Sequence, residues 1–222
     1  MPRSLVVVAA GVSEPSSTRL LADQLADSTR AAVSARGEAV DATVIEVREL
    51  ARDLATVMTT GVPTPALTAA KDAIATADGL IAVSPVFTAS YSGLFKMFFD
   101  ALDPDALTDV PVLVAATAGT PRHSLVLDHA LRPLFSYLRA RILPTGVFAA
   151  TEDFGSSELA SRISRAGAEL AAALVQADGA VAGFGGPSDL GAPRRSGTAT
   201  DLGPVADFAE LLRGHTGDQE RR

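Results

Sequence analysis

Hydrophobic residues along this chain fall into short continuous runs that alternate with longer stretches of helical periodicity. The first run, Leu5 to Ala10, is unbroken and rich in valine, which is typical of a strand buried on both faces. The stretch Thr18 to Ala35 that follows places its leucines on one helical face. Continued along the chain, this alternation predicts strands at 5–10, 40–47, 79–84, 110–116 and 142–149. It predicts helices at 18–35, 49–58, 66–77, 94–102, 124–139 and 158–177.

The alternation of strands with helices predicts an α/β fold. Successive strands separated by a helix need crossover connections, so we expect a five-stranded parallel sheet with helices on both faces. Such a doubly wound, three-layer α/β/α fold binds its ligands outside the carboxyl ends of the strands. The loops at 11–18, 84–93 and 117–123 follow strands, and a site is therefore expected there.

The last part of the chain differs in composition from the rest. From Gly179 onward it is rich in glycine, proline, serine and charged residues. We therefore expect one domain at residues 1–180 and a Gly/Pro-rich tail at 181–222. Within that tail, residues 204–212 carry apolar side chains at helical spacing, which predicts a short helix that docks on the body or on a neighbouring subunit.

The overall composition excludes several classes of protein. Of the 222 residues, 47% are hydrophobic and 20% are charged, which favours a globular chain over a disordered one. The formal net charge of −7 opposes binding to the phosphates of a nucleic acid. The chain has no cysteine, and its first apolar run is too short to span a membrane. We therefore expect a cytoplasmic protein with neither a nucleic-acid nor a membrane partner.

The first loop gathers hydroxyl side chains at the start of a helix. They belong to Ser13, Ser16, Ser17 and Thr18, and Arg19 either adds a charge beside them or points to solvent. Free N–H groups at a helix start attract anions, so these hydroxyls can complete a cradle for a phosphate; the plainer alternative is a simple helix cap. The loop lacks the Gly-x-Gly-x-x-Gly and Gly-Lys-Ser/Thr motifs, so a mononucleotide such as FMN suits it better than firmly bound NAD or ATP.

The second loop carries a specific resemblance. Its sequence, Ser84-Pro-Val-Phe-Thr-Ala-Ser-Tyr-Ser-Gly-Leu-Phe-Lys96, is similar to the Pro-(Val/Glu)-Tyr-x-x-(Ser/Ala)-x-(Ser/Pro)-Gly-x-(Leu/Phe)-Lys signature of the NAD(P)H-dependent FMN reductases, with Phe87 in place of the Tyr. The resemblance covers residues 3–176 and continues through Asp100 to Leu107, Thr117 to Thr120, Ala130 to Pro133 and Gly146 to Phe148. This order resembles the alkanesulfonate-assimilation branch, whose members supply reduced flavin to a separate flavin-dependent monooxygenase.

The resemblance implies a flavodoxin-like fold and a set of FMN contacts. Residues Pro85, Val86, Phe87 and Thr88 would run along the isoalloxazine ring, and Thr117, Ala118, Gly119 and Thr120 would hold its opposite edge. The phosphate would then lie on the hydroxyls of the first loop. Tyr91 is expected either to pack in the loop or to approach the site, and Lys96 is expected either to be structural or to meet the cofactor. Phe95, Phe98 and Phe99 follow helical spacing and are expected in the core.

The expected activity is reduction of FMN by NADPH or NADH, with hydride transfer to flavin N5. This chemistry needs no protein acid or base, so no catalytic residue is assigned. His123, His129 and His215 are too scattered to bind a metal together, and His123 either lies in solvent or approaches the flavin. Two alternatives remain, a quinone or azo-dye reductase with bound FMN and a flavodoxin-type electron carrier.

The stretch Ser124 to Arg139 is helical in pattern but contains Pro133 in its interior. Proline has no N–H for the carbonyl four residues back, which belongs to His129, and its ring crowds that carbonyl. One extra residue in the turn relieves the clash, so we expect a π-bulge around His129 to Pro133. The sulfonate branch is similar here, with a Tyr at the position of His129 that packs across a subunit interface, which implies a homodimer or homotetramer.

Overall fold

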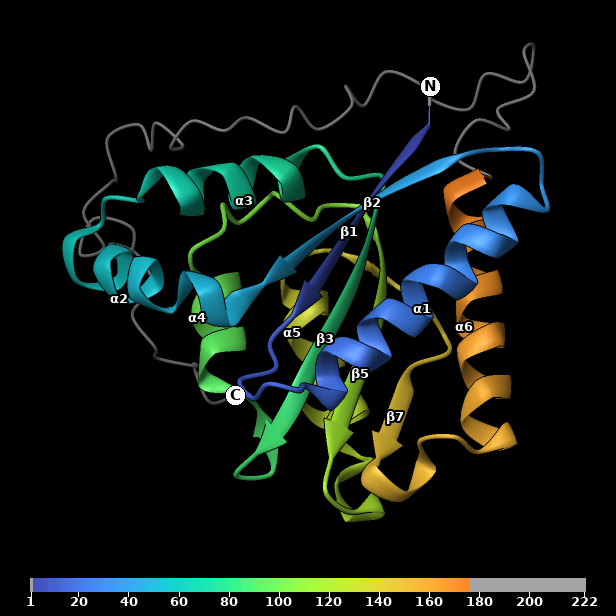
Figure 1. The fold of residues 1–222 in the computed structure, drawn as a ribbon. Coiled ribbons are helices and arrows are strands. Elements are labelled where there is room, and N and C mark those ends of the chain that lie inside the picture. The colour runs from blue at the N-terminus through green and yellow to red at the C-terminus, as the bar shows by residue number, and fades with distance from the viewer. Residues whose placement is uncertain (1, 176–222) are drawn as a thin grey trace, which may run out of the picture.

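The computed structural model describes residues 2–175 and arranges them in three layers, with a central sheet between two sets of helices (Figure 1). The sheet order is β2-β1-β3-β5, and β6 and β7 both pair with β5. All of these neighbours are parallel, which confirms the predicted doubly wound, flavodoxin-like sheet. The strands are β1 (Arg3–Ala9), β2 (Val40–Glu46), β3 (Gly79–Phe87), β4 (Ser90–Tyr91), β5 (Pro111–Ala118), β6 (Arg141–Ile142) and β7 (Val147–Ala150).

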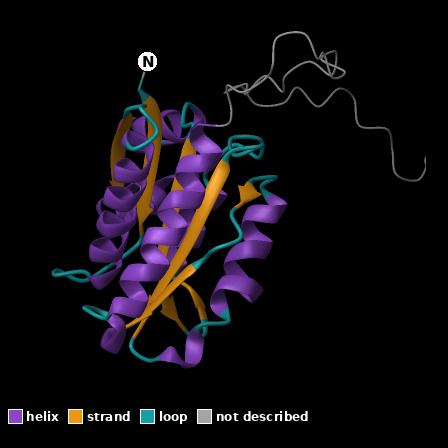
Figure 2. Cartoon of the chain, turned by 90° about the vertical axis from the view of Figure 1, so that its right-hand side faces the viewer, coloured by secondary structure: helices purple, strands orange, loops and turns teal. Residues whose placement is uncertain are grey.

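The helices cover both faces of the sheet, as the 90° view also shows (Figure 2). One face packs against α1 (Ser17–Ser34) and α6 (Ser157–Val175). The other packs against α2 (Ala51–Thr60), α3 (Pro65–Ala75), α4 (Gly93–Asp100) and α5 (Arg132–Tyr137). Each face of the sheet has its own hydrophobic core, and alternate residues of β1 pack into one core or the other. Val7 packs on the α1 side and Val8 on the opposite side, so the continuous valine run is buried on both faces as predicted.

The phenylalanines of α4 form the centre of the second core. Phe95 and Phe98 are fully buried and Phe99 is 2% exposed, which confirms their predicted place. The Phe95 and Phe99 ring centroids lie 4.7 Å apart, and the Phe99 ring meets that of Phe135 edge-on at 4.9 Å. This cluster joins α4 to α5 beneath the sheet.

The fifth strand is not the continuous strand predicted at 142–149. Val112 pairs with Ile142 but Ala115 pairs with Val147, so four residues lie against two residues of β5 and divide the strand into β6 and β7. Pro144 lies in this bulge and has no N–H for the ladder. The Arg132 guanidinium donates to the carbonyl of Leu143 at 3.0 Å and to that of Pro144 at 2.5 Å. Long-range donors therefore replace the missing ladder bonds.

A short antiparallel strand, β4, was also missed by the sequence pattern. It follows β3 through a two-residue turn in which Phe87 pairs with Ser90. The turn residues Thr88 and Ala89 have φ of 49° and 63°, the left-handed conformation that hairpin turns of this length require. Because glycine and asparagine normally occupy such positions, the sequence gives no signal for this turn.

The predicted bulge before Pro133 is confirmed. Residues Leu127–Leu131 form a π-helical segment, in which the N–H of Arg132 donates to the carbonyl of Leu127. The segment continues directly into α5, whose first turn contains Pro133. The extra residue thus accommodates the proline ring without ending the helix.

The expected tail at 181–222, its docking helix at 204–212 and His215 lie outside the described residues. Among the residues that the structure describes, no helix has the length and apolar character needed to cross a membrane.

Candidate functional site

The three predicted loops meet at a hollow of about 190 Å³ outside the carboxyl ends of β1, β3 and β5. The first loop contributes hydroxyl side chains to the wall, the second contributes apolar side chains, and the third contributes Thr117 and the small residues Ala118 and Gly119. The lining residues are Val12, Ser13, Ser17, Thr18, Pro85, Val86, Phe87, Thr117, Ala118, Gly119 and Thr151. Most of the predicted site residues are therefore brought together.

The first loop turns tightly into α1 because Gly11 has no side chain. A Cβ atom on Gly11 would lie only 2.0 Å from the Ser16 hydroxyl oxygen. That oxygen accepts a hydrogen bond from the backbone N–H of Arg19 at 3.2 Å, so Ser16 caps the helix. Ser16 does not line the hollow, and the plainer reading holds for this residue, whereas Ser13 and Ser17 border the hollow and are exposed.

Thr18 and Thr117 form the buried floor of the hollow. They are 2% and 3% exposed, and their hydroxyl oxygens lie 2.7 Å apart. One of the two hydroxyls donates to the other, so the pair retains one further hydrogen. The floor therefore ties the start of α1 to the end of β5 and still has a polar group to offer.

Arg19 does not line the hollow. Its Nε atom donates to Asp23 at 2.8 Å, and its Nη1 atom lies 2.6 Å from Glu46. The hydrogen bond to Asp23 and the charge of both carboxylates raise the pKa of Arg19. Arg48 joins the group through Glu46 at 3.1 Å and Glu14 at 3.1 Å. These ion pairs hold the loop against the end of β2.

The second loop presents an apolar edge to the hollow. Pro85 is buried at the end of β3, whereas the Phe87 side chain is 47% exposed. The base of the loop is fixed by Ser84, whose hydroxyl donates to the carbonyl of Pro85 and accepts from the N–H of Ser92 at 2.9 Å. Thr88 lies at the tip of the turn and does not line the hollow.

Two side chains with open assignments take structural positions. The Tyr91 ring packs on Phe95 at a centroid distance of 5.7 Å. The Lys96 ammonium pairs with Asp100 along α4, and Lys96 lines a different hollow, between α4 and α5. Neither borders the candidate site.

The third loop leaves room for a flat group. A Cβ atom on Gly119 would meet nothing within 4 Å, so the space beside this backbone is open. Thr120 does not line the hollow. Two lining residues, Val12 and Thr151, are missing from the sequence-based set. Thr151 follows β7 directly, and the rule that ligands lie at carboxyl strand ends could have found it.

The donor set suits a phosphorylated aromatic group. Ser17 is the first residue of α1, where backbone N–H groups are free, and Ser13 lies in the loop before it. The apolar side chains of Pro85 and Phe87 lie on the neighbouring loop. Within residues 2–175, no group of three or more His, Asp or Glu side chains is placed to hold a metal ion.

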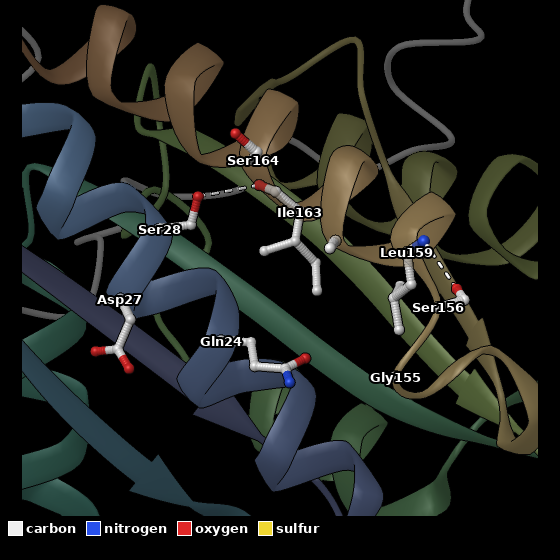
Figure 3. Close-up of a pocket in the computed structure, with 9 residues that line it drawn as sticks. Gln24, Asp27, Ser28, Gly155, Ser156, Leu159, Ile163 and Ser164 are labelled. Carbon is white, nitrogen blue, oxygen red and sulfur yellow. Dashed lines mark hydrogen bonds between the residues drawn. The ribbon is translucent and has the colours of Figure 1, made fainter.

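A larger hollow, of about 430 Å³, lies between α1 and α6 (Figure 3). Figure 3 shows the Ser28 hydroxyl directed at the carbonyl of Ile163, and the Ser156 hydroxyl bonded to the N–H of Leu159. The hydroxyls of Ser28 and Ser156 are thus engaged with backbone, Asp27 pairs with Arg30, and none of the three loops contributes to this hollow. Size alone does not make this hollow the functional site.

Comparisons with known proteins agree with this geometry. The family model for NADPH-dependent FMN reductase matches residues 3–155. The FMN reductase (NADPH) of Pseudomonas aeruginosa is 41% identical over 191 residues, which cover 85% of this chain and 96% of the relative. The NADH-dependent FMN reductase SfnF of Pseudomonas fluorescens is 39% identical over 171 residues, with coverage of 77% and 89%. The X-ray structure of an oxidoreductase from Corynebacterium diphtheriae matches with a TM-score of 0.77 at 57% identity, covering 79% of this chain and 98% of that one.

Proposed function

The chain belongs to the NADPH-dependent FMN reductase family of oxidoreductases, and we propose that the hollow at the carboxyl ends of β1, β3 and β5 is its FMN site. The observation that carries this assignment is the meeting of a hydroxyl-rich helix start with an apolar loop edge in one hollow. When bound, FMN accepts a hydride from the reduced nicotinamide nucleotide at N5.

The phosphate is bound by the first loop. Ser13 and Ser17 donate hydroxyl hydrogens beside the free N–H groups of α1, and the positive end of the helix dipole favours the anion. Ser16 and Arg19 act indirectly, because the first caps the helix and the second anchors the loop to Glu46. Thr18 and Thr117 support the floor.

The ring is positioned by the second and third loops. The Phe87 side chain and the backbone of residues 85–87 set one edge, and the open space at Gly119 receives the other. These residues orient the ring and leave one face open to the nicotinamide. No protein acid or base is required, in agreement with a wall that holds hydroxyl and apolar groups.

We also propose that FMN is released as a substrate and passed to a flavin-dependent monooxygenase. The hollow of about 190 Å³ is smaller than the ~300–1,000 Å³ of typical ligand pockets, so a bound flavin stays partly exposed and exchanges readily. The resemblance to the alkanesulfonate branch supports the monooxygenase as partner. A cytoplasmic location, where reduced nicotinamide nucleotides are supplied, belongs to the same proposal.

A homodimer or homotetramer is proposed as the working assembly. Tyr137 on α5 is 83% exposed and borders the hollow between α4 and α5 together with Leu134. Exposed aromatic groups beside apolar hollows are typical of subunit contacts. Light scattering of the full chain, compared with Tyr137→Ser, tests this assembly, and an unchanged mass would contradict a contact through Tyr137.

One assay tests the proposed activity against its alternatives. The purified full chain is mixed with NADPH or NADH, and oxidation is followed with and without added FMN. We expect slow oxidation that rises with FMN. Full activity with bound flavin and none added would indicate a quinone or azo-dye reductase, and absence of oxidation with tightly held flavin would indicate an electron carrier.

A further inference from the structure

Another hollow, of about 290 Å³ and called the second hollow below, borders the turn that follows β3 through Ala89 and shares no lining residue with the proposed flavin site. Its lining residues are Ala89, Ser90, Arg122, His123, Leu125, Val126, His129 and Ala130. They come from the turn, from the 3-10 helix Pro121–His123 and from the π-helical segment with the residues that precede it. No step of the proposed hydride transfer uses these residues.

The chemistry of this hollow is that of an anion site. Arg122, His123 and His129 all lie on its wall, and none of its lining residues is acidic. Arg122 is exposed and makes no ion pair or hydrogen bond through its side chain among residues 2–175. Asp128, next to His129 in sequence, bonds instead to Arg132 at 2.9 Å. In a chain of net charge −7, such an unpaired cluster favours a negatively charged ligand.

The two hollows are close neighbours along the chain. Phe87 lines the flavin hollow, and Ala89, two residues later, lines the second. In the same way Gly119 borders the first hollow and Arg122 the second. Two or three residues span at most about 7–11 Å, so one extended molecule can reach from one hollow to the other.

The π-helical segment supplies part of the second hollow. It buries Leu131 in the core and leaves His129 exposed beside Arg122 and His123. Such segments are often found at functional sites, and this one has no role in the flavin hollow.

We propose that Arg122, assisted by His123 and His129, binds a phosphate group of the reduced nicotinamide nucleotide. This rests on the proposed function, because the nicotinamide must lie over a ring held in the neighbouring hollow. The guanidinium presents a planar fork that matches two phosphate oxygens, and the imidazoles add N–H donors. The phosphate is either the 2′-phosphate, which only NADPH carries, or the pyrophosphate, which NADPH and NADH share.

Steady-state kinetics with saturating FMN separates these two sources. Arg122→Ala should raise the KM for the nucleotide about tenfold with little change in kcat, and Arg122→Lys should restore part of the loss. A higher KM for NADPH alone would show that Arg122 binds the 2′-phosphate. An equal rise in the KM values for NADPH and NADH would show that it binds the pyrophosphate. The matched control is Arg165→Ala, which removes an exposed arginine of α6. This variant should change neither the KM for the nucleotide nor kcat.

Direct binding provides a readout independent of turnover. Calorimetric titration of the full chain, with FMN added, uses adenosine 2′,5′-bisphosphate and ADP as probes, and at least one should bind about tenfold more weakly to Arg122→Ala. Unchanged KM values and unchanged probe affinities in Arg122→Ala would overturn the assignment, as would a loss of FMN affinity equal to the loss of nucleotide affinity. Failure of the proposed function is distinguishable, because the wild-type chain would then oxidise neither nucleotide.

Discussion

The hydroxyl oxygens of Thr18 and Thr117 lie 2.7 Å apart although the two residues are separated by 99 positions in the chain. Thr18 belongs to the first turn of α1, and Thr117 lies near the end of β5. Their hydrogen bond crosses the carboxyl end of β3 and joins two of the three loops that form the proposed flavin site. Because both side chains are almost fully buried, each depends on the other for hydrogen bonding.

This dependence predicts unequal effects of single and double substitutions. Thr18→Val or Thr117→Val leaves one buried hydroxyl without its partner and should lower the free energy of unfolding by about 1–3 kcal/mol. The double variant should lose less than the sum of the two, because no hydroxyl is left unpaired. Urea unfolding of the four proteins measures this cycle, and strictly additive losses would show that the bond contributes nothing specific.

The phosphate assignment predicts a loss of affinity that depends on the phosphate itself. Ser13→Ala with Ser17→Ala removes the two exposed first-loop hydroxyls of the proposed flavin hollow and should weaken FMN binding by about 1.5–3 kcal/mol. Riboflavin, which has the same ring but no phosphate, should bind both proteins equally in a flavin-fluorescence titration. Equal weakening of FMN and riboflavin would place the effect on the ring or on the fold instead.

Ser16→Ala is the matched control for that experiment. Its hydroxyl caps α1 and does not line the hollow, so its removal should lower stability by about 0.5–2 kcal/mol while FMN affinity at low temperature stays close to wild type. A large loss of FMN affinity in Ser16→Ala, with the fold intact by circular dichroism, would move the phosphate contact to this residue.

The hairpin turn after β3 predicts an unusual sign for a glycine substitution. Ala89 has φ of 63°, a conformation that costs an L-residue roughly 1–2 kcal/mol and costs glycine almost nothing. Ala89→Gly should therefore raise the free energy of unfolding by several tenths of a kcal/mol up to about 1 kcal/mol. The exposed helical Ala55 is the control, since Ala55→Gly should lower it by about 1 kcal/mol. A melting temperature below that of the wild type in both Ala89→Gly and Ala55→Gly would contradict the left-handed turn.

Local and periodic features of the sequence were sufficient for most of the fold. The apolar run Leu5 to Ala10 predicts β1, and the strand-end rule locates the three loops that form the proposed flavin hollow. The missing N–H of Pro133 was enough to predict the π-helical segment. Each of these features depends only on residues close together in the chain.

The features that were missed depend on partners far apart in the sequence. The sequence left Arg19 either beside the phosphate or in solvent, and instead it pairs with Glu46, which lies 27 residues away in the chain. The sequence around Pro144 does not indicate the break in the fifth strand. The break is stabilised by Arg132, which donates to the Pro144 carbonyl, and by Glu169, which accepts from the Thr145 amide. The sequence did not predict the β4 hairpin, because its turn positions, which are usually glycine or asparagine, are occupied by Thr88 and Ala89. Long-range side-chain contacts therefore account for these departures.

The split fifth strand predicts that one arginine matters through its bonds to carbonyl groups rather than through its ion pair. Arg132→Met keeps the aliphatic stem but removes the donors to the carbonyls of Leu143 and Pro144, and should lower the free energy of unfolding by about 1–3 kcal/mol. Asp128→Asn removes the exposed ion pair with the same guanidinium and should cost less than about 1 kcal/mol.

Chemical unfolding of both variants measures the difference. Hydrogen exchange at the Thr145 amide, which donates to Glu169 at 3.0 Å, reports on the bulge itself. We expect faster exchange there in Arg132→Met only. Equal destabilisation by the two variants, with unchanged exchange at Thr145, would mean that the ion pair and not the carbonyl contacts is what Arg132 contributes.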